Sequence, residues 1–295
     1  MPLHNLTEVN LRQYCKEAVE ALEFWLRRVI DITLAPEFGV EYINAKSGPD
    51  NQHIIKKSVR DSIQSRALSN PWRYPRLVDA MLLDEEIDII CHPDLYRNFF
   101  KEYFEKSFPL GNDQLRNCLR KILEPRNNLA HANPISVRQA EQIICYSRDV
   151  IDSIKDRLKE KNLDREYNAP TIIKVSDSRG LVFHDSQIRR NNTGRGCIDL
   201  TSEQSAWLRS GDTVGIEVEI DPSFPAEEYN VDWVFPERVN AQKYNSNRRV
   251  VLSLTDANVR VDFTIYCKVV SKMNWHKCGD VDDCVGITYK VLPQI

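Results

Sequence analysis

Long apolar runs are absent from this sequence. No stretch approaches the roughly 20 apolar residues that a membrane-spanning helix needs, and the N-terminal MPLHNLTEVN has no secretion-signal core. We therefore predict a cytoplasmic protein with no membrane partner. In a reducing compartment its eight cysteines are expected to be free thiols.

An excess of basic charge is absent as well. Residues 1–168 contain 25 Lys and Arg against 26 Asp and Glu, and residues 169–295 contain 15 against 17, which excludes a diffuse polyanion-binding surface. One local exception is the stretch 53–76, which is either the solvated face of a helix or an RNA-binding surface. Its candidate RNA-binding residues are Lys56, Lys57, Arg60, Arg73 and Arg76.

Several common catalytic motifs are also missing: no Gly-rich phosphate loop, HExxH or GxSxG occurs. His276, Cys278 and Cys284, with Cys267 nearby, offer soft ligands for zinc. However, the C-x5-C spacing matches no common structural zinc pattern, which favours free thiols. We expect neither a metal nor a cofactor.

Helical periodicity dominates the first 168 residues. The first helix has its apolar stripe at Leu11, Cys15, Ala18, Leu22, Trp25, Leu26, Val29 and Ile32, and Pro36 and Gly39 should interrupt it. Further helices are expected over about 53–67, 75–91 and 93–107, then from 111, and finally from a capping box at Ser136 and Gln139. The pattern predicts an all-α bundle over 1–168.

Alternating, β-branched patterns dominate residues 169–295. Strands are predicted at 171–175, 181–184, 196–199, 213–220, 229–235, 249–255, 260–270 and 285–292. Turn-forming residues separate them. So many short strands in about 125 residues predict a β-sandwich.

The hexapeptide RNNLAH carries the candidate chemistry at Arg126, Asn127 and His131. Cleavage of a phosphodiester without a metal needs one group that stabilises charge on the phosphate and another that moves a proton. A guanidinium and an imidazole supply both. Arg-x4-His alone would arise by chance about 0.5 times in a chain with this composition, so the context must support it.

That context is a helix that is predicted to end at the motif. Pro125 should kink or restart the helix just before Arg126, and Pro134 should close it. Positions five residues apart diverge by about 140° on a straight helix. Arg126 and His131 can therefore act together if the helix bends or unwinds, or if each meets the other copy's group across a dimer.

Residues 75–160 resemble the HEPN superfamily of small helical nucleotide- and RNA-handling domains, in particular its branch named after the yeast transcript-surveillance endonuclease. The stretches that carry this resemblance are IDIICHPDLYRNFFKEYF, LRKILEPRNNLAHANPIS and the apolar last helix from Val137. The superfamily signature is an Arg, usually followed by a polar residue, with a His a few positions on. Arg126, Asn127 and His131 match it.

The resemblance implies a metal-independent endoribonuclease, often a toxin or an antiviral effector, with a composite site across a symmetric homodimer. His131 would be its general acid and base, Arg126 would stabilise the charged pentacoordinate phosphate, and Asn127 would orient one of them or contact phosphate. The products would be a 2′,3′-cyclic phosphate and a 5′-hydroxyl.

Two departures concern the activity. Some toxins of the family have a Tyr two residues after the His, where this chain has Asn133, so modification at that position is not supported. Other members have lost catalysis and keep the Arg and His as a brace at a helix end. A non-catalytic adaptor or scaffold, with both domains as interaction modules, is therefore the alternative.

The C-terminal half weakly resembles an immunoglobulin-like sandwich. Trp233 falls in the third-strand region, where we expect it in the core, and Cys267 falls in the sixth. The second strand has no Cys to pair with Cys267, and Phe263 and Tyr266 are out of step with a tyrosine corner. Because such modules generally bind proteins, the resemblance implies a protein partner or trigger.

Overall fold

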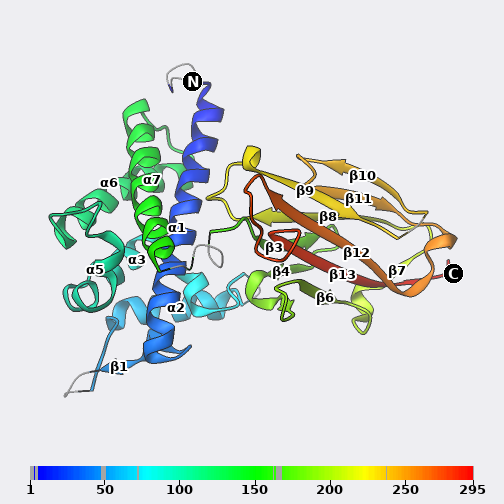
Figure 1. The fold of residues 1–295 in the computed structure, drawn as a ribbon, viewed down its shortest axis with the longest axis horizontal. Coiled ribbons are helices and arrows are strands. Elements are labelled where there is room, and N and C mark those ends of the chain that lie inside the picture. The colour runs from blue at the N-terminus through cyan, green and yellow to red at the C-terminus, as the bar shows by residue number, and fades with distance from the viewer. Residues whose placement is uncertain are drawn as a thin grey trace. The chain divides into compact units, whose positions relative to one another are not determined.

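The computed structural model describes residue 3 and residues 6–47, 51–71, 73–161, 163, 168–236 and 238–294. The chain divides into two compact units, residues 1–163 and 164–295. Helices form the first unit and strands dominate the second, as predicted (Figure 1). The division lies a few residues before the predicted one at 168/169.

The helical unit contains seven α-helices in its described residues. They are α1 (Glu8–Phe38), α2 (Lys57–Ser69), α3 (Leu83–Ile90), α4 (Pro93–Leu95), α5 (Lys101–Phe104), α6 (Asn112–Ala130) and α7 (Val137–Glu160). Shorter elements are the 3₁₀ turns η2 (Tyr42–Asn44) and η3 (Leu77–Ala80), the π-helical turn η4 (Tyr96–Phe100), and a hairpin of β1 (Lys46–Ser47) and β2 (Gln52–His53). The hairpin occupies the start of the helix that was predicted over 53–67.

Helices α1 and α7 form the centre of this unit and lie side by side (Figure 1). Most of the predicted α1 stripe is fully buried, including Leu22, Trp25 and Leu26 at 0% exposure. Removing each such side chain from water contributes about 2 to 3 kcal/mol. The predicted capping box also forms, because Ser136 Oγ accepts from the Gln139 amide at 3.2 Å while the Gln139 side chain accepts from the Ser136 amide at 2.9 Å.

Pro36 does not interrupt helix α1, and Pro125 does not restart helix α6. Helix α1 continues past Pro36 and ends at Phe38, and the predicted interruption at Gly39 is confirmed, because Gly39 is the C-cap with a left-handed φ of 80°. Helix α6 runs through Pro125 without restarting and ends at Ala130. Pro125 is buried, so its ring contributes packing that offsets the lost backbone hydrogen bond.

The strand unit has two sheets. Its strands are β3 (Ile172–Asp177), β4 (Val182–His184), β5 (Arg189–Arg190), β6 (Gly196–Asp199), β7 (Leu208–Arg209), β8 (Thr213–Ile220), β9 (Tyr229–Val234), β10 (Asn240–Tyr244), β11 (Arg249–Ser253), β12 (Arg260–Ser271) and β13 (Asp283–Leu292), with 3₁₀ turns η5 (Asp185–Gln187), η6 (Gln204–Ala206), η7 (Ala226–Glu228) and η8 (Asp256–Asn258). One sheet has the order β10-β11-β8-β3-β4 and the other β5-β6-β13-β12-β9, with β7 also paired to β13. All eight predicted strands are present.

Both sheets contribute to one apolar core. Their inward side chains alternate with exposed ones, as in β9, where Tyr229, Val231 and Trp233 are buried. Trp233 is 4% exposed, which confirms its core position, and its register partner on β12 is the fully buried Cys267. Among the described helices of the chain, none has the length and apolar character needed to cross a bilayer.

Candidate functional site at the C-terminal end of helix α6

The end of α6 is built by a tight turn around His131. His131 is the C-cap residue, and Ala132 adopts a left-handed conformation with φ of 57°. The Ala132 amide donates to the Leu129 carbonyl at 3.3 Å and the Asn133 amide to the Asn128 carbonyl at 2.8 Å. These two bonds are those of a Schellman motif, with alanine at the position usually taken by glycine. The helix thus ends before Pro134 and presents His131 on a defined turn.

Arg126 is oriented by a carboxylate on α1. Its Nε donates to Oε1 of Glu23 at 3.1 Å, and its Nη2 lies 3.1 Å from the same oxygen. On the other edge of the guanidinium, Nη1 donates to Oδ1 of Asn127 at 3.3 Å. The Arg126 side chain is 22% exposed and Glu23 is 14% exposed. The cation is therefore held by the protein and still reachable from solvent.

Glu23 belongs to a row of alternating charges. Its Oε2 lies 2.9 Å from Nη2 of Arg27, which also donates to the Met81 carbonyl at 2.7 Å. Nε of Arg27 lies 2.8 Å from Oε1 of the fully buried Glu86 on α3. Burial raises the pKa of Glu86 well above its usual range, although Arg27 opposes this shift. Arg126, Glu23, Arg27 and Glu86 therefore form one network that links α6, α1 and α3.

His131 has a different environment. The residue is exposed, and its backbone amide donates to the Asn127 carbonyl at 3.0 Å. Within the described ranges, no hydrogen bond or ion pair involves its imidazole, and none joins it to Arg126. The structure therefore brings Arg126 and Asn127 into contact and leaves the imidazole available to an outside group.

Two of the five candidate RNA-binding residues take part in ion pairs. Arg76 lies 2.9 Å from Asp31 and 2.8 Å from Asp79, and Lys56 lies 3.7 Å from Asp88. The contacts of Arg76 attach η3 to α1. They thus have a structural use that requires no nucleic acid.

The other three candidate RNA-binding residues each have a different environment. Arg60 donates to the Ile55 carbonyl at 3.1 Å, Arg73 stacks over the ring of Tyr74 at 5.3 Å, and Lys57 is exposed at the start of α2. In the part of the chain that the structure describes, none of the five candidates bonds to Arg126, Asn127 or His131. Their role in RNA binding stays a prediction.

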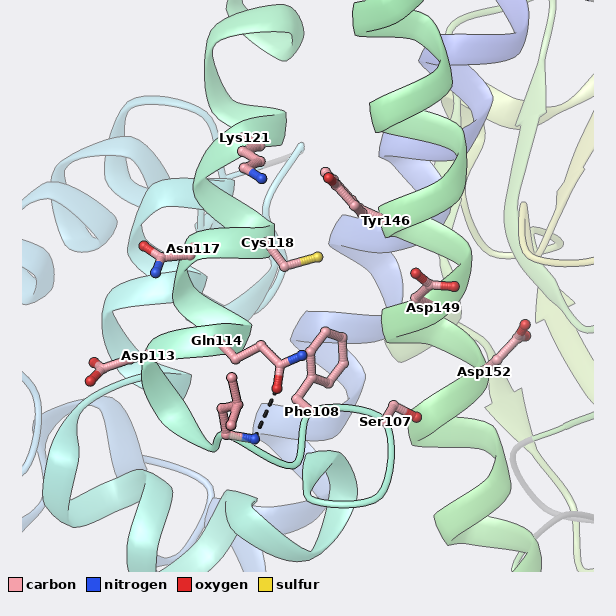
Figure 2. Close-up of a pocket in the computed structure, with 11 residues that line it drawn as sticks. Ser107, Phe108, Asp113, Gln114, Asn117, Cys118, Lys121, Tyr146, Asp149 and Asp152 are labelled. Carbon is pink, nitrogen blue, oxygen red and sulfur yellow. Dashed lines mark hydrogen bonds between the residues drawn. The ribbon is translucent and has the colours of Figure 1, made fainter.

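A separate open groove of about 720 Å³ lies between α6 and α7. Figure 2 shows Cys118 and Lys121 on α6 across from Tyr146 and Asp149 on α7. The groove is lined by three carboxylates, from Asp113, Asp149 and Asp152, and by one ammonium group, from Lys121, which lies 5.5 Å from the Tyr146 ring. This excess of negative charge repels a phosphodiester backbone. The groove includes neither Arg126 nor His131, and we do not assign RNA to it.

His276 and Cys278 of the strand unit both contact Asp282. Nδ1 of His276 lies 3.0 Å from Asp282, and the thiol of Cys278 lies 3.5 Å from the Asp282 carbonyl. All eight cysteines are free. Among the described residues, no cluster of three or more His, Cys, Asp or Glu side chains is arranged to hold a metal.

Glu23, Arg27 and Glu86 were missed from the sequence. Glu23 and Arg27 form an i, i+4 pair beside the buried α1 stripe, which a search for charges next to core positions could have found. No local sequence pattern predicts that Glu23 contacts Arg126, because Arg126 lies about 100 positions further along the chain. A comparison with protein-family models gave no match to this chain, and a comparison with curated protein sequences gave none either.

Proposed function

We propose that this chain is a metal-independent endoribonuclease of the HEPN type and that Arg126, Asn127 and His131 form half of its site. One observation carries the proposal. The same helix end holds a guanidinium oriented by a carboxylate and, five positions on, an exposed imidazole with no hydrogen bond among the described residues. Glu23 holds the Arg126 guanidinium while leaving it accessible, and His131 follows on the exposed terminal turn. These are the two groups that metal-free phosphodiester cleavage requires.

The reaction transfers one proton at each end of an in-line displacement. A neutral imidazole accepts the proton of the ribose 2′-hydroxyl, and the 2′ oxygen forms a bond to phosphorus. The bond between phosphorus and the 5′ oxygen breaks, and a protonated imidazole donates to that oxygen. Arg126 stabilises the charge on the pentacoordinate phosphate. The products are a 2′,3′-cyclic phosphate and a 5′-hydroxyl.

A homodimer through the helical unit would supply the second imidazole. The attacking and leaving oxygens lie on opposite sides of phosphorus, so base and acid must approach from opposite sides. Arg126 and His131 diverge by about 140° if both continue one straight helix, and α6 is unbroken through Pro125. His131 of the partner subunit can then act on the side that this chain's own His131 does not reach.

The cleavage test compares wild type with His131→Ala on mixed single-stranded RNA in EDTA. We expect wild type to leave cyclic-phosphate ends and His131→Ala to lose at least about 100-fold in rate, the range of general acid–base catalysis. His184→Ala is the matched control, because His184 is partly exposed and lies on β4 of the strand unit, outside the unit that contains the candidate site. Cleavage that survives His131→Ala rejects the mechanism.

The ion pair between Arg126 and Glu23 favours a second candidate function. In a non-catalytic adaptor, Arg126 would only brace α6 against α1, and both units would be interaction modules. Intact RNA after incubation with concentrated, dimeric wild type would reject the ribonuclease proposal and leave the adaptor. If wild type cleaves no RNA and Arg126→Ala lowers the free energy of unfolding, the result supports the adaptor function.

For the strand unit we propose an immunoglobulin-like fold that recognises a protein partner or trigger. The order β3-β8-β11-β10 corresponds to strands A, B, E and D of a constant-type domain, and β9-β12-β13 to C, F and G. The pairing of Trp233 with Cys267 supports the same alignment. A cytoplasmic toxin or antiviral effector whose RNA cleavage is stimulated when this unit is engaged would combine both proposals by analogy.

A further inference from the structure

Arg12, near the start of α1, contacts the turn that carries His131. Its Nη2 donates to the Leu129 carbonyl at 3.2 Å, and its Nη1 donates to the Asn133 carbonyl. Leu129 and Asn133 lie two positions before and two positions after His131. One planar guanidinium therefore holds the backbone on both sides of the candidate catalytic residue.

This contact acts where the turn is weakest. Within the turn the Leu129 carbonyl accepts a long bond of 3.3 Å from the Ala132 amide, and the carbonyls at a helix end carry partial negative charge, which a cation stabilises. Ala132 adds strain, because the Cβ of an L-residue makes the left-handed region unfavourable relative to glycine. The turn is exposed, so no core packing holds it in this shape. Arg12 supplies the tertiary contact that the turn itself lacks.

We propose that Arg12 is a positioning residue for His131, an inference that rests on the proposed ribonuclease function. By fixing the Leu129 and Asn133 carbonyls, it fixes the peptide groups between them and hence the direction in which the imidazole leaves the backbone. A misplacement of about 1 Å at a catalytic group costs on the order of 100-fold in rate. Arg12 thus affects the chemistry through His131 without contacting the reacting atoms.

The test uses the full-length chain with Arg12→Ala and Arg12→Lys. Lysine keeps the charge but lacks the planar fork that reaches two carbonyls at once. Lys16→Ala is the matched control, because Lys16 is one turn along α1, 64% exposed, and paired only loosely with Glu20 at 3.7 Å. Steady-state cleavage of RNA and hydrogen exchange of the Asn133 amide are measured on all four proteins.

We expect kcat to fall about 10- to 100-fold in Arg12→Ala while KM stays within about twofold. The Asn133 amide should exchange at least about tenfold faster, and Arg12→Lys should be intermediate. Lys16→Ala should match wild type in both measurements. An unchanged kcat, or a raised KM at constant kcat, overturns the proposal, because the latter marks Arg12 as a phosphate contact only.

The two proposals can fail separately. If wild type cleaves no RNA, the ribonuclease proposal fails, and amide exchange alone then tests the contact of Arg12 with the turn. Unchanged protection of the Asn133 amide in Arg12→Ala would then reject the contact. If wild type cleaves RNA and Arg12→Ala cleaves equally well, only the positioning role fails.

Discussion

Replacing Glu23 by glutamine should destabilise the helical unit by about 3 kcal/mol. The carboxylate lies within 3.1 Å of two Arg126 nitrogens and within 2.9 Å of one Arg27 nitrogen. Hydrogen bonds to charged groups contribute about 1.5 to 3 kcal/mol each, and partial exposure places these at the low end. Glutamine keeps the shape but removes the charge and turns an NH₂ group toward a guanidinium. Two cations then share a half-buried space without their carboxylate.

Urea unfolding followed by circular dichroism at 222 nm measures this effect, because the helices are in the unit that contains Glu23. A loss of about 3 kcal/mol corresponds to a fall in Tm of about 6 to 12 °C for a unit of this size. Glu17→Gln is the control, since Glu17 lies on the same helix, is exposed, and accepts a hydrogen bond from the Gln13 side chain at 2.8 Å. A destabilisation below about 0.5 kcal/mol in Glu23→Gln would refute the network as a source of stability.

Two further predictions concern the same region. Burial raises the pKa of Glu86, so above the usual glutamate pKa of about 4.3 the folded protein binds a proton that the unfolded chain does not. The free energy of unfolding should therefore fall with rising pH by up to about 1.4 kcal/mol per pH unit. The fall ends once the pH exceeds the pKa of Glu86 in the folded protein. Urea midpoints measured at increasing pH above the usual glutamate pKa should fall in wild type and not in Glu86→Gln, and parallel curves would contradict the prediction. Ala132→Gly should raise the free energy of unfolding by about 0.5 to 1 kcal/mol, since glycine adopts the left-handed φ of 57° without strain. Thermal unfolding checks this, and a lower Tm would show that the turn is not strained.

The predicted strands were found wherever β-branched residues alternate with polar ones over several positions. Three strands of the second unit were missed: β5 and β7 have two residues each, and β10 reads NAQKY and is mostly exposed. These three segments are strands because they pair with a neighbouring strand, so no local sequence pattern predicts them. Similarly, Pro125 is a helix breaker by local rules, yet its burial in the unit keeps α6 continuous.

The candidate site also contains residues that the local sequence predicts and residues that only the fold brings to it. Arg126, Asn127 and His131 stand within six positions, and their chemistry can be read directly from the sequence. Glu23 and Arg12 lie more than 100 positions away on α1, and only the packing of α1 against α6 gives them a role. The number of possible partners for Arg126 across the chain is too large for spacing to select one.

By itself, the sequence determined the change from helices to strands, the apolar faces of α1 and α7, and the helix end at which a guanidinium and an imidazole occur. These depend on periodicity, capping and residue chemistry, which act over a few positions. Only the tertiary structure decided that α6 passes through Pro125, that Glu23 orients Arg126, and that Arg12 holds the turn at His131. These depend on which helix surfaces meet, because a charge or a carbonyl is stabilised by whatever group the fold brings within about 3 Å of it.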